Sequence, residues 1–422
     1  MSNTINFSKS TSFNLPKRGR SEFRFQIIGI GAILLSLAFL SWLTITVVFG
    51  SLGAFKHVEI AVPVDLTSKN IDAGDVNSAS FGSIMKSGLR EQFPDVKKRK
   101  DKKKLYKLIS VEGSLELKEK VLDNRDLLGQ KVKIWVSASD DVSLYVRGKI
   151  DDTLPEDQRK ITDKEISWIN NLEANGQIRT KVNWGFFRNG DSREPEIAGI
   201  LAALVGSTLS LLVCFILSFP LGVSAAIFLE QFAPRNRLSD IIEVNINNLA
   251  AVPSIVFGLL GLSIFLGYFD LPRSSPLVGG MVLSLMTLPT IIIASRASLQ
   301  AVPPSIKEAA LALGATPVQA VFHHVFPVAL PGMMTGAIVG MARALGDTAP
   351  LLMIGMVAFI VDIPKSILEP ATALPVQVFL WADSPERAFN EKTSAAIIVL
   401  LIFLIVMNLS AVLLRRKLEQ RF

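Results

Sequence analysis

The chain has 422 residues, a formal net charge of +7 and a hydrophobic content of 50%. Charged residues still make up 19% of it, which is too many for a protein that lies entirely within a membrane. No G-x-x-x-x-G-K-[ST] phosphate loop occurs, so the chain is not expected to hydrolyse ATP. The basic residues gather at the edges of apolar runs without a nucleic-acid motif, which excludes nucleic acid as a partner and favours membrane lipid.

Cysteine and histidine are too scarce to build a redox or metal site. The single cysteine, Cys214, lies in an apolar run, and two of the three histidines, His323 and His324, are adjacent and would point to different helix faces. No disulfide, metal or cofactor is therefore predicted.

Six apolar runs are each long enough to cross a bilayer, which takes about 20 residues. They lie at 26–49, 197–219, 246–268, 277–294, 329–360, where the run is interrupted, and 395–414. Basic residues precede the first run and follow the last, so both termini are predicted to be cytoplasmic. These residues are Lys17, Arg18, Arg20, Arg24, Arg415, Arg416, Lys417 and Arg421. Residues 1–25 form the cytoplasmic N-terminal segment, and residues 26–49 an uncleaved first span.

Residues 50–195 are mostly polar and form a periplasmic insert large enough for one small domain. Alternating residues predict strands at Lys131–Val136 and Ser143–Arg147, and Asp163–Leu172 reads as a helix. The lysine-rich run Lys97–Lys104 is either a solvated loop or an electrostatic patch for anionic lipid or an anionic ligand. The insert is therefore predicted to be a small mixed α/β domain.

Prolines and one arginine mark the middle of the membrane part. Pro253 and Pro289 lie within or near spans and should kink them. Arg296 lies at the inner end of the fourth span, where it is either an exit site for an anion or an anchor that follows the positive-inside rule.

A polar segment between the fourth and fifth spans reads as two short helices with a sharp turn. Residues Lys307–Leu313 predict a helix with Glu308 in its first turn, where a carboxylate suits the positive end of the helix dipole. Gly314 stands where that helix would end. Thr316 and Pro317 predict the N-cap and first residue of the second helix.

This spacing resembles the EAA loop of ABC importer permeases. The matching residues are Glu308, Ala309, Ala310, Gly314 and Pro327, whereas His324 stands at an apolar position and Phe326 replaces Leu. The resemblance implies that the cytoplasmic loop 295–327 docks on an ATP-binding subunit, with small alanines allowing a close approach. The alternative is an ordinary amphipathic connecting helix.

Arg343 and Asp347 are charges within the fifth apolar run. They are four residues apart, which predicts one helix face and mutual reach. Counted from Pro331, Arg343 lies roughly 18 Å along the helix, well inside a hydrocarbon core of about 30 Å. Two interpretations are open: a structural ion pair, or an anion pathway in which Arg343 presents its donor fork to oxyanion oxygens.

Glycine and proline surround these two charges. Gly332, Gly336 and Gly340 recur every four residues and predict a smooth face for close helix packing. Gly346 and Pro350 flank Asp347 and weaken the helix there, and membranes tolerate this only beside protein or water.

Several segments together resemble the PstA-type permeases of bacterial phosphate ABC importers. The resemblance covers 197–414 and is carried by AVPSIVFGLL at 251–260, MMTGAIVGMARALGDTAPLL at 333–352 and LPVQVFLWADSP at 374–385. It implies phosphate as the substrate. The chain departs from the family at Asp347, where Glu is frequent. We hypothesise that Asp347 accepts the hydrogen bond of protonated phosphate and repels fully deprotonated sulfate.

The resemblance implies an all-α polytopic membrane protein with the six transmembrane helices of the type I ABC importer permease fold. The permease domain then spans 196–422, and the mixed α/β extracytoplasmic insert precedes it. The implied function is alternating-access import of phosphate across the inner membrane by a transport subunit that is not an enzyme. Implied partners are two ATP-binding subunits, a second homologous permease in a heterodimer, and a periplasmic phosphate-binding protein. Alternatives are a permease for another oxyanion or solute, or a membrane-anchored sensor or scaffold.

Overall fold

The computed structural model describes residues 15–67, 76, 79–234, 236–357 and 359–418. It divides into two compact units, residues 1–49 and 50–422. Helix α1 (Leu15–Ser51) builds the first unit, and its segment Glu22–Ser51 is long and apolar enough to cross a membrane. The side chains of the predicted basic residues Lys17, Arg18 and Arg20, and the whole of Arg421, lie outside the described part.

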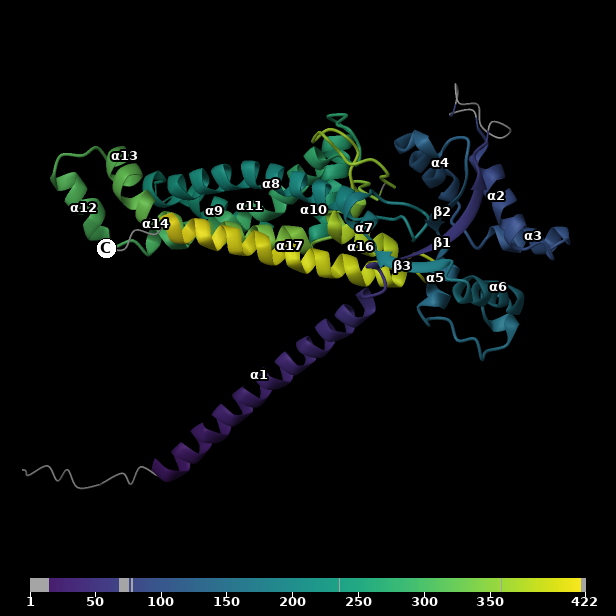
Figure 1. Cartoon of the computed structure of the whole chain (residues 1–422). Coiled ribbons are helices and arrows are strands. Elements are labelled where there is room, and N and C mark those ends of the chain that lie inside the picture. Colours follow the sequence, from purple (N-terminus) through teal and green to yellow (C-terminus); the bar gives the residue numbers. More distant parts are fainter. Residues whose placement is uncertain (1–14, 68–75, 77–78, 235, 358, 419–422) are drawn as a thin grey trace, which may run out of the picture. The chain divides into compact units, whose positions relative to one another are not determined.

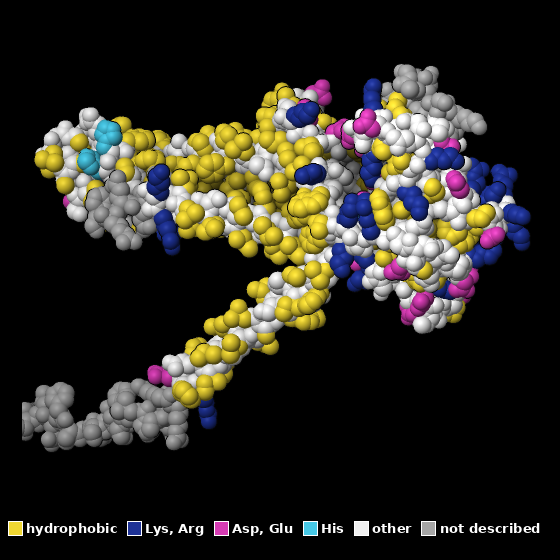
Figure 2. All heavy atoms as spheres, in the orientation of Figure 1, with side chains coloured by type: hydrophobic (Ala, Val, Ile, Leu, Met, Phe, Trp, Pro, Cys, Tyr) yellow, Lys and Arg dark blue, Asp and Glu magenta, His cyan; other side chains and the backbone are white. Residues whose placement is uncertain are grey.

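Four further helices of the second unit are long and apolar enough to span a membrane (Figure 1). They are α8 (Leu201–Ile227), which continues as the π-helical segment η4 (Phe228–Phe232), α11 (Pro276–Gln300), α14 (Phe326–Gly346), which follows α13 (Pro317–Ala320) and η6 (Val321–Val325), and α17 (Phe389–Leu418). Figure 2 shows hydrophobic side chains over these helices, whereas Lys, Arg, Asp and Glu gather on the insert.

The predicted span at 246–268 is broken. Helices α9 (Arg237–Ala250) and α10 (Ser254–Gly261), the latter continuing as η5 (Leu262–Leu266), are bent by 99° at a short break. Pro253 lies at this break, where it lacks an amide donor and keeps the preceding residue from helical geometry. The described residues thus hold five membrane-length helices, or six if the bent pair counts as one span.

Helix α11 packs between α8 and α14. The contact between α11 and α14 uses the predicted glycine face of α14. A Cβ at Gly332 would collide with Ser298 of α11, and a Cβ at Gly336 would collide with Ala294. These glycines therefore serve helix packing, as expected. Pro289 lies inside the continuous helix α11.

The fifth apolar run is interrupted directly after Arg343. Helix α14 ends at Gly346, Asp347 is extended with φ −92° and ψ 107°, and the short helix α15 (Ala349–Met353) follows. After it, α16 (Leu374–Ala382) precedes α17.

The insert contains a three-stranded antiparallel sheet in the order β2-β1-β3. The central strand β1 (Lys56–Asp65) begins five residues after α1, and β2 (Lys131–Ser137) and β3 (Ile178–Val182) flank it. The register places Val62 opposite Ile134 and Ile60 opposite Ile178. The predicted strand Lys131–Val136 is therefore present.

Helices cover this sheet and correct two predictions. They are α2 (Phe81–Gln92), α3 (Arg99–Tyr106), α4 (Gly113–Asp123), α5 (Asp140–Val146), α6 (Asp163–Ala174) and α7 (Gly185–Arg188), with 3₁₀ turns at Arg125–Leu127 and Glu156–Gln158. The predicted strand Ser143–Arg147 is wrong, because its first four residues belong to α5 and Arg147 is the C-cap of that helix. Most of the lysine-rich run is not a loop but helix α3, which is anchored by buried Leu105. The predicted helix at Asp163 is present.

The insert is joined to the start of α17 by buried charges and aromatic rings. Arg147, the C-cap of α5, forms an ion pair with Glu391 and donates a hydrogen bond of 2.5 Å to the carbonyl oxygen of Gly53. Both side chains of the ion pair are only 11% exposed. Phe186 packs on Trp381 of α16, so the connection is both polar and apolar.

Candidate functional site

Arg343 lies in the last turn of α14 and is exposed. Within the described residues its guanidinium makes no ion pair. The helix ends at Gly346, which takes Asp347 off the helical face that the spacing predicted. The arrangement therefore differs from the structural ion pair, the first of the two interpretations, and leaves the N–H donors of Arg343 without an acidic partner among the described residues.

Asp347 is held by a residue that the sequence did not single out. The hydroxyl of Ser254 donates a hydrogen bond of 3.0 Å to Oδ1 of Asp347. Ser254 begins α10 directly after the 99° bend, and Gly258 one turn further approaches Pro350 so closely that a Cβ would collide. The two breaks in the membrane helices thus meet, and Ser254 fixes the carboxylate between them. Its signal in the sequence was a hydroxyl after Pro253 within an apolar run.

Arg296 is already occupied by carboxylates. Its guanidinium lies 3.0 Å from Glu243 of α9 and 3.4 Å from Glu230 of η4, and its side chain is 19% exposed. Gln300 also donates to Glu230, at 2.9 Å. These contacts fasten α11 to α9 and η4, which is the behaviour of an anchor. Sequence reasoning missed both glutamates because they lie more than 50 residues from Arg296.

The loop between α11 and α14 is a helix, turn, helix unit. Helix α12 (Pro304–Ala312) starts earlier than predicted, so Glu308 is not in its first turn. Gly314 follows with φ +88°, which only glycine adopts without strain. The short helix α13 (Pro317–Ala320) then begins with the expected N-cap Thr316, whose side chain forms a capping box with Gln319. The π-helical η6 (Val321–Val325) leads into α14.

The loop presents an apolar surface to its surroundings. Glu308, Ala309 and Gly314 are exposed, whereas Ala310 is buried against the loop itself. Leu313 at the turn is 91% exposed. Leu311, Val318 and Phe322 of the same unit are exposed as well, so apolar side chains make up much of its surface.

Metal chemistry finds no support in the described part of the chain. No group of three or more His, Cys, Asp or Glu side chains there has an arrangement that would hold a metal ion.

Two family models match the chain. Residues 218–422 match the family described as Binding-protein-dependent transport system inner membrane component, and residues 13–156 match a Domain of unknown function (DUF3333). The probable ABC transporter permease protein YqgI of Bacillus subtilis is 30% identical over 247 residues, which are 55% of this chain and 83% of that protein. Phosphate transport system permease protein PstA 1 of Mycobacterium tuberculosis is 29% identical over 233 residues, 55% of this chain and 75% of that protein.

A solved structure of the MetNI methionine ABC transporter, in an inward-facing conformation, is also similar. The comparison gives 17% sequence identity and a TM-score of 0.43, and it covers 52% of this chain and 97% of the MetNI chain.

The chain therefore belongs to the ABC transporter permeases, the inner-membrane components of binding-protein-dependent transport systems. Within that family it is a PstA-type permease, as its motifs predicted. It is a multi-pass inner-membrane transport subunit and not an enzyme, with a mostly helical fold and a small sheet. Membership implies an ATP-binding subunit and a substrate-binding protein as partners.

Proposed function

We propose that this permease carries inorganic phosphate into the cell by alternating access. Relatives named as phosphate transport permeases support the substrate. Exposed Arg343 and the anchored carboxylate of Asp347, four residues further along the chain, carry the proposal, because these two groups complement a protonated oxyanion. Arg343 donates to the phosphate oxygens, and Asp347 accepts the phosphate proton.

The pathway has its other half on a second, homologous permease. Arg343 is exposed in the isolated chain, and a charge at membrane depth needs protein or water beside it. A heterodimer partner supplies that surface. Both termini are cytoplasmic in this arrangement, because Arg415, Arg416 and Lys417 end α17. The insert is then periplasmic, on the side of the phosphate-binding protein.

Arg296 has the weaker claim to the substrate. In the described arrangement Glu230 and Glu243 neutralise its guanidinium. We assign it the task of holding α9 and η4 to α11, and an anion contacts it only where these ion pairs open.

The loop around Gly314 couples the permease to two ATP-binding subunits. Exposed Glu308, Ala309 and Leu313 form the docking surface, and the positive φ of Gly314 sets the angle between α12 and α13. Buried Ala310 supports α12 from the inside. The bend and the exposed leucine support this role over that of an ordinary connecting helix.

The test is uptake of radiolabelled phosphate in a strain without its own permease, complemented with the wild-type chain, Arg343→Gln or Gly314→Asp. Both variants should reach the membrane at normal levels. Arg343→Gln should lose about 30-fold or more of uptake, since removing one partner of a desolvated charged contact costs about 2–5 kcal/mol. Gly314→Asp should uncouple transport from ATP hydrolysis.

Gly129→Asp is the matched control, because Gly129 has φ +82° and, like Gly314, open space around it. It introduces the same backbone strain and the same charge away from the loop. Equal losses for Gly129→Asp and Gly314→Asp would contradict the coupling role. No phosphate uptake by the wild-type chain with its partners present would replace phosphate with another solute.

A further inference from the structure

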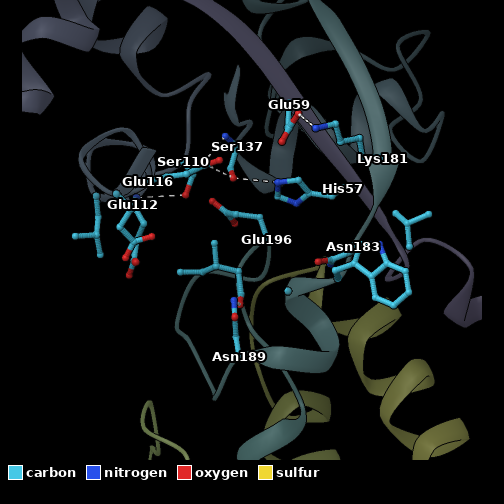
Figure 3. A pocket seen from close by; sticks show the side chains of 16 residues that line it. His57, Glu59, Ser110, Glu112, Glu116, Ser137, Lys181, Asn183, Asn189 and Glu196 are labelled. Carbon is cyan, nitrogen blue, oxygen red and sulfur yellow. Dashed lines mark hydrogen bonds and ion pairs between the residues drawn. The ribbon is translucent and has the colours of Figure 1, made fainter. Parts of the chain in front are cut away.

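The insert contains a cavity of about 440 Å³ that phosphate import leaves unexplained (Figure 3). Its walls come from the start of β1, from α4, and from the ends of β2 and β3. The linker into α8 closes it with Asn189, Glu196 and Ile197. Insert and permease linker thus share one cavity.

The lining is strongly acidic. Five glutamates, Glu59, Glu112, Glu116, Glu119 and Glu196, line it together with a single lysine, Lys181. Glu59 is satisfied by Arg179 at 2.6 Å and Lys181 at 3.3 Å. Glu116 is satisfied by Lys120 at 2.5 Å and by the backbone amide of Ser137 at 2.8 Å. Among the described residues, neither Glu112 nor Glu119 forms a salt bridge, so the cavity keeps surplus negative charge.

Glu196 gives independent evidence that the cavity lacks a hydrogen-bond donor. The residue is 8% exposed, and its Oε2 has no hydrogen-bond partner within the described structure. Figure 3 shows its carboxylate directed into the cavity, towards Ser110 and Glu116. A buried carboxylate oxygen without a donor is costly, so a ligand that donates N–H bonds would remove this cost.

The remaining contacts define the chemistry of that ligand. The described carboxylates have no arrangement for a metal ion. The hydroxyls of Ser110 and Ser137 line the same wall, and the ring of Trp184 and the side chain of Leu115 are exposed in the lining. Spaced acceptors combined with apolar surface and one aromatic face suit ammonium groups separated by methylenes. We propose that the cavity binds an organic di- or polyamine, which contacts the insert and the linker to α8 at the same time.

The test is calorimetric titration of the purified full chain in a non-ionic detergent with spermidine, at about 0.15 M NaCl to screen surface charge. Saturable binding of one ligand per chain is expected. Glu196→Gln and the double variant Glu112→Gln with Glu119→Gln should each weaken the Kd about tenfold or more, because each removes charged hydrogen-bond acceptors. The double variant changes no buried residue, because Glu119 is exposed and Glu112 is half-buried, so it tests the cavity independently of Glu196.

Glu173→Gln is the control, because Glu173 is an exposed carboxylate of α6 that does not line the cavity. It should leave the Kd unchanged. Three results would overturn the proposal: no saturable binding, an equal weakening by Glu173→Gln, or displacement of spermidine by MgCl₂ at the same concentration. The last result would make the cavity a divalent-cation site.

Discussion

Two arginines of this chain differ in burial and in their ion-pair partners. Arg147, where the insert meets α17, is 11% exposed and is satisfied by Glu391 and by the Gly53 carbonyl. Arg343, at the broken end of α14, is exposed and has no ion-pair partner within the described residues. A charge whose partners lie in its own chain holds the fold together. A charge without such partners is available to something that arrives from outside.

The largest expected effect is a difference in the free energy of unfolding between variants of the two arginines. Arg147→Met should lower the free energy of unfolding by about 3–5 kcal/mol, because it leaves Glu391 buried without its partner. Arg343→Met removes no ion pair and should change it by less than about 0.5 kcal/mol. Thermal unfolding of both variants in detergent measures this difference. Equal losses of stability would end the distinction between the two charges.

Glu196 sharpens the comparison on the side of the insert. Burial raises its pKa from 4.5 to about 7, and nearby Asp140 and Glu194 act in the same direction. The folded state therefore holds this proton more tightly than the unfolded state does. Ionised Glu196 then destabilises the fold, by an amount that grows from about pH 4.5 to about pH 7 and reaches about 3 kcal/mol.

Glu196→Gln should remove this pH dependence and raise the unfolding midpoint at pH 8, but not at pH 4. Unfolding midpoints of both chains across this range provide the measurement. Glu173→Gln, an exposed carboxylate, should leave the wild-type pH profile intact. A Glu196→Gln profile that falls as steeply as the wild type would place the titrating group elsewhere.

The smallest expected effect concerns the membrane-spanning part and its selectivity between phosphate and sulfate. Ser254→Ala frees Asp347 from its hydrogen bond of 3.0 Å and should weaken phosphate uptake about fivefold to tenfold, because a typical hydrogen bond contributes about 1 kcal/mol or slightly more. Asp347→Asn should also reduce the preference for phosphate over sulfate. Competition of sulfate with radiolabelled phosphate measures this preference. An unchanged preference in Asp347→Asn would refute discrimination by this carboxylate.

Sequence reasoning worked where a single periodic signal decides the structure. Apolar length predicted the long spans, and side-chain chemistry predicted the N-cap Thr316 and the turn at Gly314. It failed where contacts far apart in the chain decide. Pro253 predicted a kink, but the 99° bend also depends on how α10 packs against α15. The Arg296 ion pairs likewise join three separate elements.

The errors in the insert have local causes. The segment Ser143–Arg147 is too short for alternation to distinguish a strand from a helix, and Asp140 and Asp141 in the first turn favour the helix that forms. The lysines of α3 are good helix formers, with Asp101 near the start and Lys103 and Lys104 in the last turn. Helix α12 begins earlier than predicted because Pro304 is a favourable first helical residue.

The contact between Arg147 and Glu391 also sets an order for biogenesis. The two residues are separated by 244 positions in the chain. At a synthesis rate of about 5–20 residues per second, Glu391 leaves the ribosome roughly 12–50 s after Arg147. During that interval the arginine is hydrated and the insert has no attachment to α17. Closure of this ion pair is consequently a late event, which couples completion of the insert to arrival of the last membrane span.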